Sequence, residues 1–208
     1  MSRYDLQATS SLVVPQINRS TIMLAGGTYF DIEDPESSEF TIEDIAHALS
    51  NICRFTGHCR TFYSVAQHSV LVSHALPEEH AFAGLMHDAA EALIGDVSTP
   101  LKMLLPDYKR IESRIEAVVF ARFGLPLQLP QCVKEADRFL LRTEQRDVMG
   151  ADTHSWNFTA GVQPLTERIQ PLPPTEAKAL FLARFAALRP TVVQKAEEAE
   201  HSISRQRG

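Results

Sequence analysis

The sequence predicts an all-α fold, a helical bundle that carries one small N-terminal β-hairpin. From about residue 41 onward, apolar residues recur at helical spacing between residues that typically start and stop helices. Before this region, residues 20–34 (STIMLAGGTYFDIED) place β-prone residues on both sides of Gly26-Gly27. That pattern favours a hairpin with a two-residue turn.

Two helix starts are marked by side chains that can cap a helix. Thr41 begins the stretch TIED, in which Asp44 stands at the third position, as in a capping box. Ser64 and Gln67 have the same spacing, and the apolar pattern that follows extends to Leu76. We therefore expect the first two helices to begin directly after Thr41 and Ser64.

The remaining helices are expected over about residues 77–94, 107–123, 131–149 and 175–188. Pro77 is a residue favoured at the first helical position, and the helix that it begins should end before Gly95. Asp107 is expected to cap the fourth helix and Gly124 to stop it. The sixth helix follows the helix-breaking stretch PLPP.

The length and composition indicate one globular domain. The chain has 208 residues, of which 44% are hydrophobic and 22% charged, as in ordinary folded domains. We expect the domain to cover residues 20–190. Residues 1–19 are expected to form a loose N-terminal arm and residues 191–208 a flexible C-terminal tail.

Charge and hydropathy limit the partners and the location of the protein. The longest apolar runs fall short of the roughly 20 residues that a membrane helix needs, and the N-terminus lacks the pattern of a secretory signal. We therefore expect a cytoplasmic protein with no membrane partner. The net charge of −6 argues against binding of a nucleic acid polymer, which requires clustered Lys and Arg.

The stretch GLMHDAAEALIGDVSTP places three chemically active residues in a run that otherwise resembles a buried helix. Four-residue spacing puts His87 and Glu91 on one helical face, with Asp88 about 100° around the axis from His87. An isolated His-Asp pair is usually structural. Here two further polar residues are expected to face the core.

These two residues complete a set of potential metal ligands. His68 has the apolar Val65 and Val72 at helical spacing. Asp137 falls in an apolar stripe with Val133 and Leu140, and burial of a carboxylate is costly unless a cation is near. Two histidines and two aspartates brought together by three helices would suit a divalent transition metal, with open positions for water and phosphate.

The order His68, then His87-Asp88, then Asp137 resembles the HD-domain metal-dependent phosphohydrolases. The stretches SVAQHSVLVS, LMHDAAEALIGDVSTPLK and VKEADRFLL are similar to those of compact 5′-deoxynucleotidases and of phage triphosphohydrolases that act on dATP. This resemblance covers about residues 28–150. It implies an HD-domain helical bundle in which these four residues bind a divalent ion such as Mn, Co, Mg or Zn.

The resemblance also implies roles for residues around the ligands. Glu91 matches the glutamate that positions or deprotonates the attacking water, and it forms the expected catalytic set with Asp88 and Arg54. Arg54 matches an arginine that neutralises phosphate, and Phe55 stands where some nucleotidases have a tryptophan near the base. Asp96 matches an acid near the sugar.

Further positive groups are candidates for holding a polyphosphate, namely His58, Arg60 and Lys102. A triphosphate needs such groups, whereas a monophosphate does not, so these residues bear on which of the two is the substrate. The first expectation is a 5′-deoxynucleotidase that releases phosphate from a deoxynucleoside monophosphate. The alternative is a dATP or dNTP triphosphohydrolase that releases triphosphate.

A different class also fits the pattern, that of a nucleotide-binding regulator without turnover. A regulator would be expected to lose at least one ligand or the glutamate, whereas all are present in this sequence. In either class the partner is a small nucleotide. The resemblance also implies assembly into a homodimer or a higher homo-oligomer.

Overall fold

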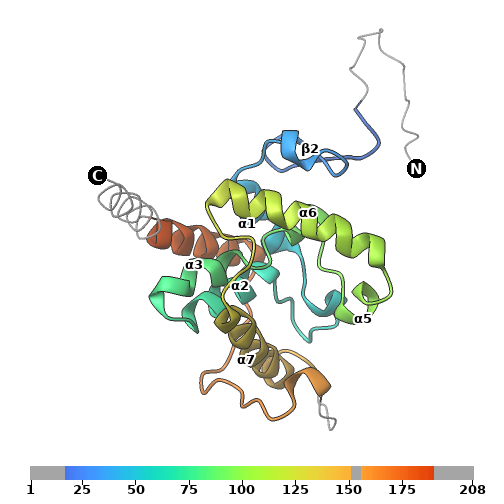
Figure 1. Ribbon diagram of the computed structural model, residues 1–208. Coiled ribbons are helices and arrows are strands. Elements are labelled where there is room, and N and C mark those ends of the chain that lie inside the picture. Colours follow the sequence, from blue (N-terminus) through green and yellow to red (C-terminus); the bar gives the residue numbers. More distant parts are fainter. Residues whose placement is uncertain (1–16, 151–155, 190–208) are drawn as a thin grey trace, which may run out of the picture.

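The computed structural model describes residues 17–150 and 156–189, and the chain is predominantly helical (Figure 1). The expected all-α fold with a small N-terminal hairpin is confirmed. The named helices are α1 (Ile42–Asn51), α2 (Val65–His74), α3 (Glu78–Met86), α4 (Glu91–Ile94), α5 (Thr99–Lys102), α6 (Pro106–Phe123) and α7 (Gln131–Asp147). A C-terminal helix covers residues 174–189. The expected tail, and nearly all of the expected N-terminal arm, lie outside the described residues.

The hairpin pairs β1 (Thr21–Met23) with β2 (Tyr29–Asp31) in antiparallel register. The predicted two-residue turn is wrong. The backbone N–H of Leu24 donates to the carbonyl of Thr28 at 2.8 Å, so three residues lie between the paired positions. The last of them, Gly27, has φ 88°, the left-handed conformation that a three-residue hairpin loop requires.

The caps of α1 and α2 lie where the sequence predicts them, but they differ in kind. Thr41 forms a complete capping box with Asp44. Ser64 accepts a hydrogen bond from the backbone N–H of Gln67 at 3.2 Å. The Gln67 side chain does not return to Ser64: its Nε2 donates to the carbonyl of Gln170 at 2.8 Å. The second helix also ends at His74, before Leu76.

The predicted third helix is two helices. α3 ends at Met86 and α4 begins at Glu91. His87 Nδ1 lies 2.8 Å from the carbonyl oxygen of Gly84, an acceptor that a continuous helix would use for its own backbone. After this point, Ala89 N–H bonds to Met86 and Glu91 N–H to Asp88, which are the tighter three-residue turns. The break thus coincides with the His-Asp pair.

The later helices follow the predicted pattern with one correction. α6 begins at Pro106, and Asp107 lies in its first turn instead of capping it. The Asp107 carboxylate pairs with Arg110 at 3.2 Å on the exposed surface. Gly124 ends α6 with φ 72°, as predicted, because glycine adopts this left-handed conformation without strain.

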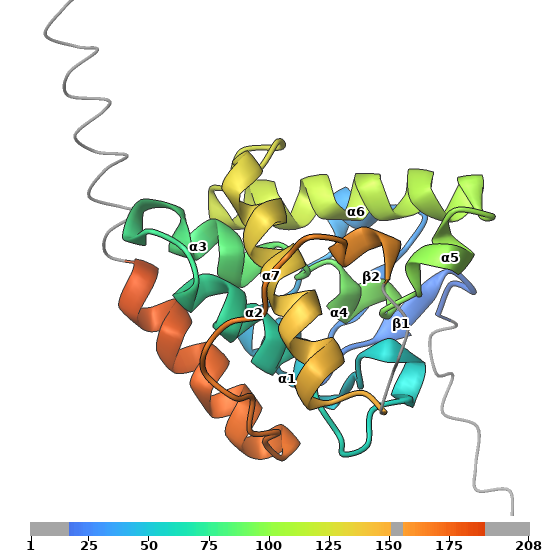
Figure 2. The ribbon, with the colours of Figure 1, turned by 90° about the horizontal axis from the view of Figure 1, so that it is seen from below.

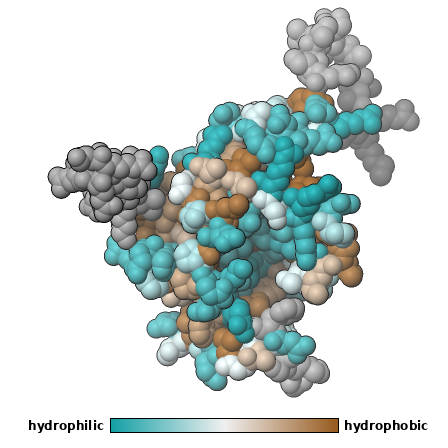
Figure 3. Space-filling model, in the orientation of Figure 1, coloured by the Kyte–Doolittle hydropathy of each residue, from teal (hydrophilic) through white to brown (hydrophobic). Residues whose placement is uncertain are grey.

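α2 lies at the centre of the helical layers and packs against α1, α3 and α7 (Figure 2). Buried residues of the main core come from α1, α2, α3, α6 and the C-terminal helix, including Ile45, Leu49, Val65, Leu85, Ile115 and Phe181. The face of the molecule seen in Figure 3 is largely hydrophilic, with scattered apolar areas. No helix in the described part of the chain is long and apolar enough to cross a membrane. The central position of α2 buries His68 completely.

Candidate metal centre

Three side chains from three segments gather in a group that could hold a metal ion: His68, His87 and Asp137. His68 comes from α2, His87 from the break between α3 and α4, and Asp137 from α7. One donor atom from each lies within 4.8 Å of the others. The two Nε2 atoms are 3.4 Å apart, and His68 Nε2 is 3.2 Å from Asp137 Oδ1.

Asp88 joins this group from the side of the helix break. Its Oδ2 lies 3.2 Å from His87 Nε2 and 3.5 Å from His68 Nε2. All four residues that the sequence analysis named as ligands therefore lie together. We call them the His/Asp cluster.

Asp137 is only partly buried, since 41% of its side chain is exposed. Its neighbours Lys134, Glu135 and Arg138 are exposed, which places Asp137 at the border of the buried face of α7. The carboxylate contacts the fully buried His68 on one side and faces solvent on the other. The cluster is therefore open at Asp137, as a site that admits a ligand must be.

The two imidazoles point their Nε2 atoms toward each other, 3.4 Å apart. His68 Nδ1 lies 2.6 Å from Glu144 Oε1, and His87 Nδ1 lies 2.8 Å from the carbonyl of Gly84. Oxygen acceptors hold the proton on Nδ1 and leave the Nε2 lone pair free, the arrangement usual for metal-binding histidines. Two lone pairs facing each other at 3.4 Å repel unless a proton or a metal ion lies between them. The mixed nitrogen and oxygen donors fit a divalent ion.

Without a metal ion, protons take its place in the cluster. Burial disfavours the charged form of His87, but the Asp88 carboxylate outweighs burial and raises the pKa of His87 to about 9. The same contact holds the pKa of Asp88 below its usual range, against the effect of burial. The site therefore favours positive charge among its carboxylates.

Glu144 supports the cluster from behind, and the sequence analysis did not identify it. Its side chain is fully buried and accepts hydrogen bonds from Arg54 Nη2 at 3.0 Å and from Tyr63 Oη at 2.9 Å. Burial raises the pKa of Glu144, but the charge of Arg54 and the contact with His68 outweigh it and hold that pKa low. The available signal was its position in α7, two turns after Asp137 and on the same face.

Glu91 also lies near the cluster, close to Asp88, but its carboxylate has other partners than that of Glu144. The side chain is 9% exposed, and its Oε1 lies 3.4 Å from Lys102 Nζ. Oε2 has no hydrogen-bond partner among the described residues. Burial, together with the nearby charges of Asp88 and Asp96, raises the pKa of Glu91 well above its usual value. Asp96 itself has a raised pKa, chiefly because of burial.

Arg54 contacts both Asp88 of the cluster and the supporting Glu144. Its Nη1 lies 3.6 Å from Asp88 Oδ2, while Nη2 binds Glu144. The Phe55 ring lies 5.3 Å from the Arg54 guanidinium and 6.0 Å from the ring of Trp156. Phe55 and Thr56 both have positive φ angles, 54° and 53°. Such strain in non-glycine residues concentrates at functional sites, where the surrounding structure holds it.

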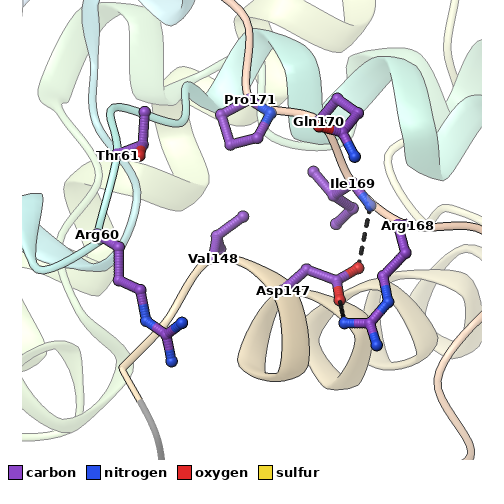
Figure 4. Close-up of a pocket in the computed structure, with 8 residues that line it drawn as sticks. All are labelled: Arg60, Thr61, Asp147, Val148, Arg168, Ile169, Gln170 and Pro171. Carbon is purple, nitrogen blue, oxygen red and sulfur yellow. Dashed lines mark hydrogen bonds and ion pairs between the residues drawn. The ribbon is translucent and has the colours of Figure 1, made fainter.

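The three remaining positive candidates lie in different surroundings. Lys102 Nζ is 2.6 Å from Glu112 and so lies between two carboxylates. His58 is exposed. Arg60 lines a cavity of about 320 Å³, none of whose lining residues belongs to the His/Asp cluster (Figure 4). Of the expected phosphate ligands, Arg54 is the one that contacts a cluster residue directly.

Fold and cluster together define an all-α protein with a histidine and aspartate site that could hold a metal ion. No model of a known protein family matches the chain. The chain is 46% identical over 168 residues to the uncharacterized protein YfdR of Escherichia coli K12, covering 80% of this chain and 94% of the relative. It is 33% identical over 190 residues to the uncharacterized protein RCAP_rcc00048 of Rhodobacter capsulatus, covering 83% of this chain and 97% of the relative. The chain belongs to this YfdR family.

Proposed function

We propose that the protein is an HD-domain metal-dependent phosphohydrolase of deoxynucleotides, and first of all a 5′-deoxynucleotidase. The observation that carries the proposal is the pair of Nε2 atoms, from His68 and His87, that face each other while oxygen acceptors hold both Nδ1 atoms. Asp88 and Asp137 add one carboxylate oxygen each. This donor set supports binding of a divalent ion, with Mn, Co, Mg and Zn as candidates.

A bound divalent ion would neutralise phosphate oxygens and lower the pKa of a coordinated water to roughly 7. Glu91 supplies a buried carboxylate oxygen, without a partner in the described part of the chain, that can accept the proton of the attacking water. Water oxygen bonds to phosphorus, and the bond from phosphorus to the 5′ oxygen breaks. The deoxynucleoside leaves with one proton, and orthophosphate remains.

Arg54 contributes the positive charge on the phosphate side. It lies 3.6 Å from Asp88, so a phosphate bound beside the cluster would be within reach of its guanidinium. Charge-assisted contacts of this kind stabilise the negative charge that moves during transfer. The Phe55 ring lies 5.3 Å from the Arg54 guanidinium, and Asp96 is our candidate for contacting the sugar.

The surroundings of the other cations favour the monophosphate over the triphosphate. Lys102 is already paired with Glu112 and Glu91, and Arg60 lines a separate cavity. A triphosphate would need unpaired positive groups beyond the metal. We therefore place the dATP triphosphohydrolase second. A cytoplasmic location and assembly into homo-oligomers belong to the same proposal.

The test is product analysis with deoxynucleoside monophosphates and dATP in the presence of Mn²⁺, Co²⁺, Mg²⁺ or Zn²⁺. We expect deoxynucleoside and orthophosphate from a monophosphate. Release of triphosphate from dATP with no reaction of dAMP would favour the alternative. Nucleotide binding without turnover in any metal would instead indicate a regulator.

Two variants on α7 connect activity to the cluster. Asp137→Asn is expected to lose bound metal and at least about 10²-fold in turnover, because one ligand loses its charge. Glu135→Gln alters an exposed carboxylate of the same helix and should behave as wild type. Circular dichroism of both variants checks that a loss of activity does not reflect unfolding.

A further inference from the structure

The cavity that contains Arg60 lies between three segments of the chain. Its lining residues are Arg60, Thr61, Asp147, Val148, Arg168, Ile169, Gln170 and Pro171. They come from the loop before α2, from the end of α7, and from the segment that precedes the C-terminal helix. The volume of about 320 Å³ is at the lower end of the range for cavities that bind small molecules.

Hydrogen bonds hold the walls of the cavity in place. The backbone N–H of Arg60 donates to the carbonyl of Val148 at 2.9 Å. The Gln67 side chain donates to the carbonyl of Gln170 and accepts from the N–H of Leu172, at 2.8 and 2.9 Å. Gln67 precedes the cluster ligand His68. The cavity therefore has fixed walls that are joined to α2 and α7, both of which carry cluster residues.

Asp147 lines the cavity, but its charge is already neutralised. Both carboxylate oxygens accept hydrogen bonds from Arg146, at 2.7 Å each. Arg168 Nη1 and the backbone N–H of Ile169 add contacts at 2.8 and 3.0 Å. These contacts, that of Arg146 first, lower the pKa of Asp147 to about 2. Asp147 thus fixes Arg168 and the cavity wall while leaving an excess of positive charge.

The two arginines that line the cavity have donors to offer. Arg168 uses Nη1 for Asp147, and a guanidinium carries five N–H donors. Within the described residues, no ion pair engages the Arg60 guanidinium. Figure 4 shows the two side chains extending from opposite sides of the cavity, with Val148 and Ile169 between them. Both side chains are exposed, so a ligand in solution can reach them.

We infer that this cavity is a second ligand site, separate from the His/Asp cluster, for a small molecule that bears a phosphate group. Arg60 and Arg168 bind the phosphate by charge-assisted hydrogen bonds, the interaction in which guanidinium groups excel. Val148, Ile169 and Pro171 provide apolar contacts for the rest of the molecule. The site needs neither the metal ion nor hydrolysis, so it stands independently of the proposed function.

The experiment is calorimetric titration of the full chain with inorganic phosphate and with pyrophosphate in the presence of a chelator. The chelator removes metal-mediated anion binding, and because Arg54 still lies beside the metal-free cluster, Asp137→Asn is titrated in parallel to separate the two sites. Arg60→Gln and Arg168→Gln should each weaken binding at least about tenfold, because each removes a charge-assisted contact. Arg110→Gln removes an exposed arginine of α6 and should leave the Kd unchanged.

A second pair of variants tests the site without touching the hydrogen-bonded wall. Thr61 is exposed at the cavity. Thr61→Glu introduces a negative charge and should abolish binding, while Thr61→Gln has similar size without charge and should retain it. The inference is overturned if wild type shows no saturable binding of either anion, or if the Arg60 and Arg168 variants bind as wild type does. A tenfold change in Asp137→Asn would place the anion at the cluster and also overturn it.

Discussion

Two buried glutamates near the His/Asp cluster, Glu144 and Glu91, differ in the groups that surround their carboxylates. Glu144 contacts Arg54, Tyr63 and His68, and its pKa is lowered. Glu91 has one oxygen near Lys102 and one without a partner among the described residues, and its pKa is raised. The difference shows that burial alone does not define the role of a carboxylate. We propose that Glu144 orients a ligand and that Glu91 is available for proton transfer.

The same substitution at both positions should separate the two roles most strongly in stability. Glu144→Gln leaves the buried Arg54 without its closest counter-charge, so we expect the free energy of unfolding to fall by about 3 kcal/mol or more. Glu91→Gln removes a poorly compensated buried charge and should leave stability unchanged or raise it. Urea denaturation in the presence of chelator measures both, and equal losses would refute the contrast.

The next largest effect concerns turnover. Glu91→Gln should lower kcat by about 10²-fold or more, the usual scale for a positioned general base, while the variant keeps its metal. Steady-state kinetics on a deoxynucleoside monophosphate and elemental analysis of the same sample provide the two readouts. Wild-type kcat in this variant would remove Glu91 from the mechanism.

A smaller effect is expected on metal binding from behind the cluster. Glu144 accepts from His68 Nδ1 and so fixes the orientation of that ring. Residues that hold a ligating histidine in this way typically contribute 10- to 100-fold to metal affinity. We expect about tenfold weaker Mn²⁺ binding in Glu144→Gln, measured by competition with a chelating dye. Unchanged affinity would mean that the Glu144 contact is dispensable for the site.

The smallest effect is expected in the pH dependence of stability, and its sign differs between the two glutamates. The folded-state pKa of Glu144 is lowered, so its contribution is present above the unfolded value and is lost as pH falls through the folded value. The pKa of Glu91 is raised, so its charged form costs stability as pH rises above the unfolded value. Denaturation from pH 7 down to pH 3 should therefore show opposite trends relative to wild type: the advantage of Glu91→Gln shrinks as pH falls toward about 4.5, and the deficit of Glu144→Gln shrinks only below about 4.5.

Local signals in the sequence predict much of the fold. Thr41 and Ser64 cap the helices that follow them, and Gly124 ends α6, because each acts through its own backbone neighbourhood. The break between α3 and α4 has no such signal. It depends on a hydrogen bond from the His87 side chain to the carbonyl of Gly84, which helical periodicity does not encode.

The candidate site, too, is predicted by the sequence only in part. His68, His87, Asp88 and Asp137 could be assigned by motif order, and the structure brings them together. The sequence does not single out Glu144, because its role depends on Arg54 and Tyr63, which lie 90 and 81 positions away. Arg60 is a phosphate candidate from its charge alone, whereas the fold places it in a cavity apart from the His/Asp cluster.

The central claim is that the two Nε2 atoms and the two aspartates hold one divalent ion. Crystals grown with Mn²⁺ and measured for anomalous scattering test it directly. The account predicts a single strong peak between His68 Nε2 and His87 Nε2, about 2.0–2.3 Å from each, with Asp88 and Asp137 as further ligands. A map with no peak there, or with manganese bound only elsewhere on the chain, would contradict it.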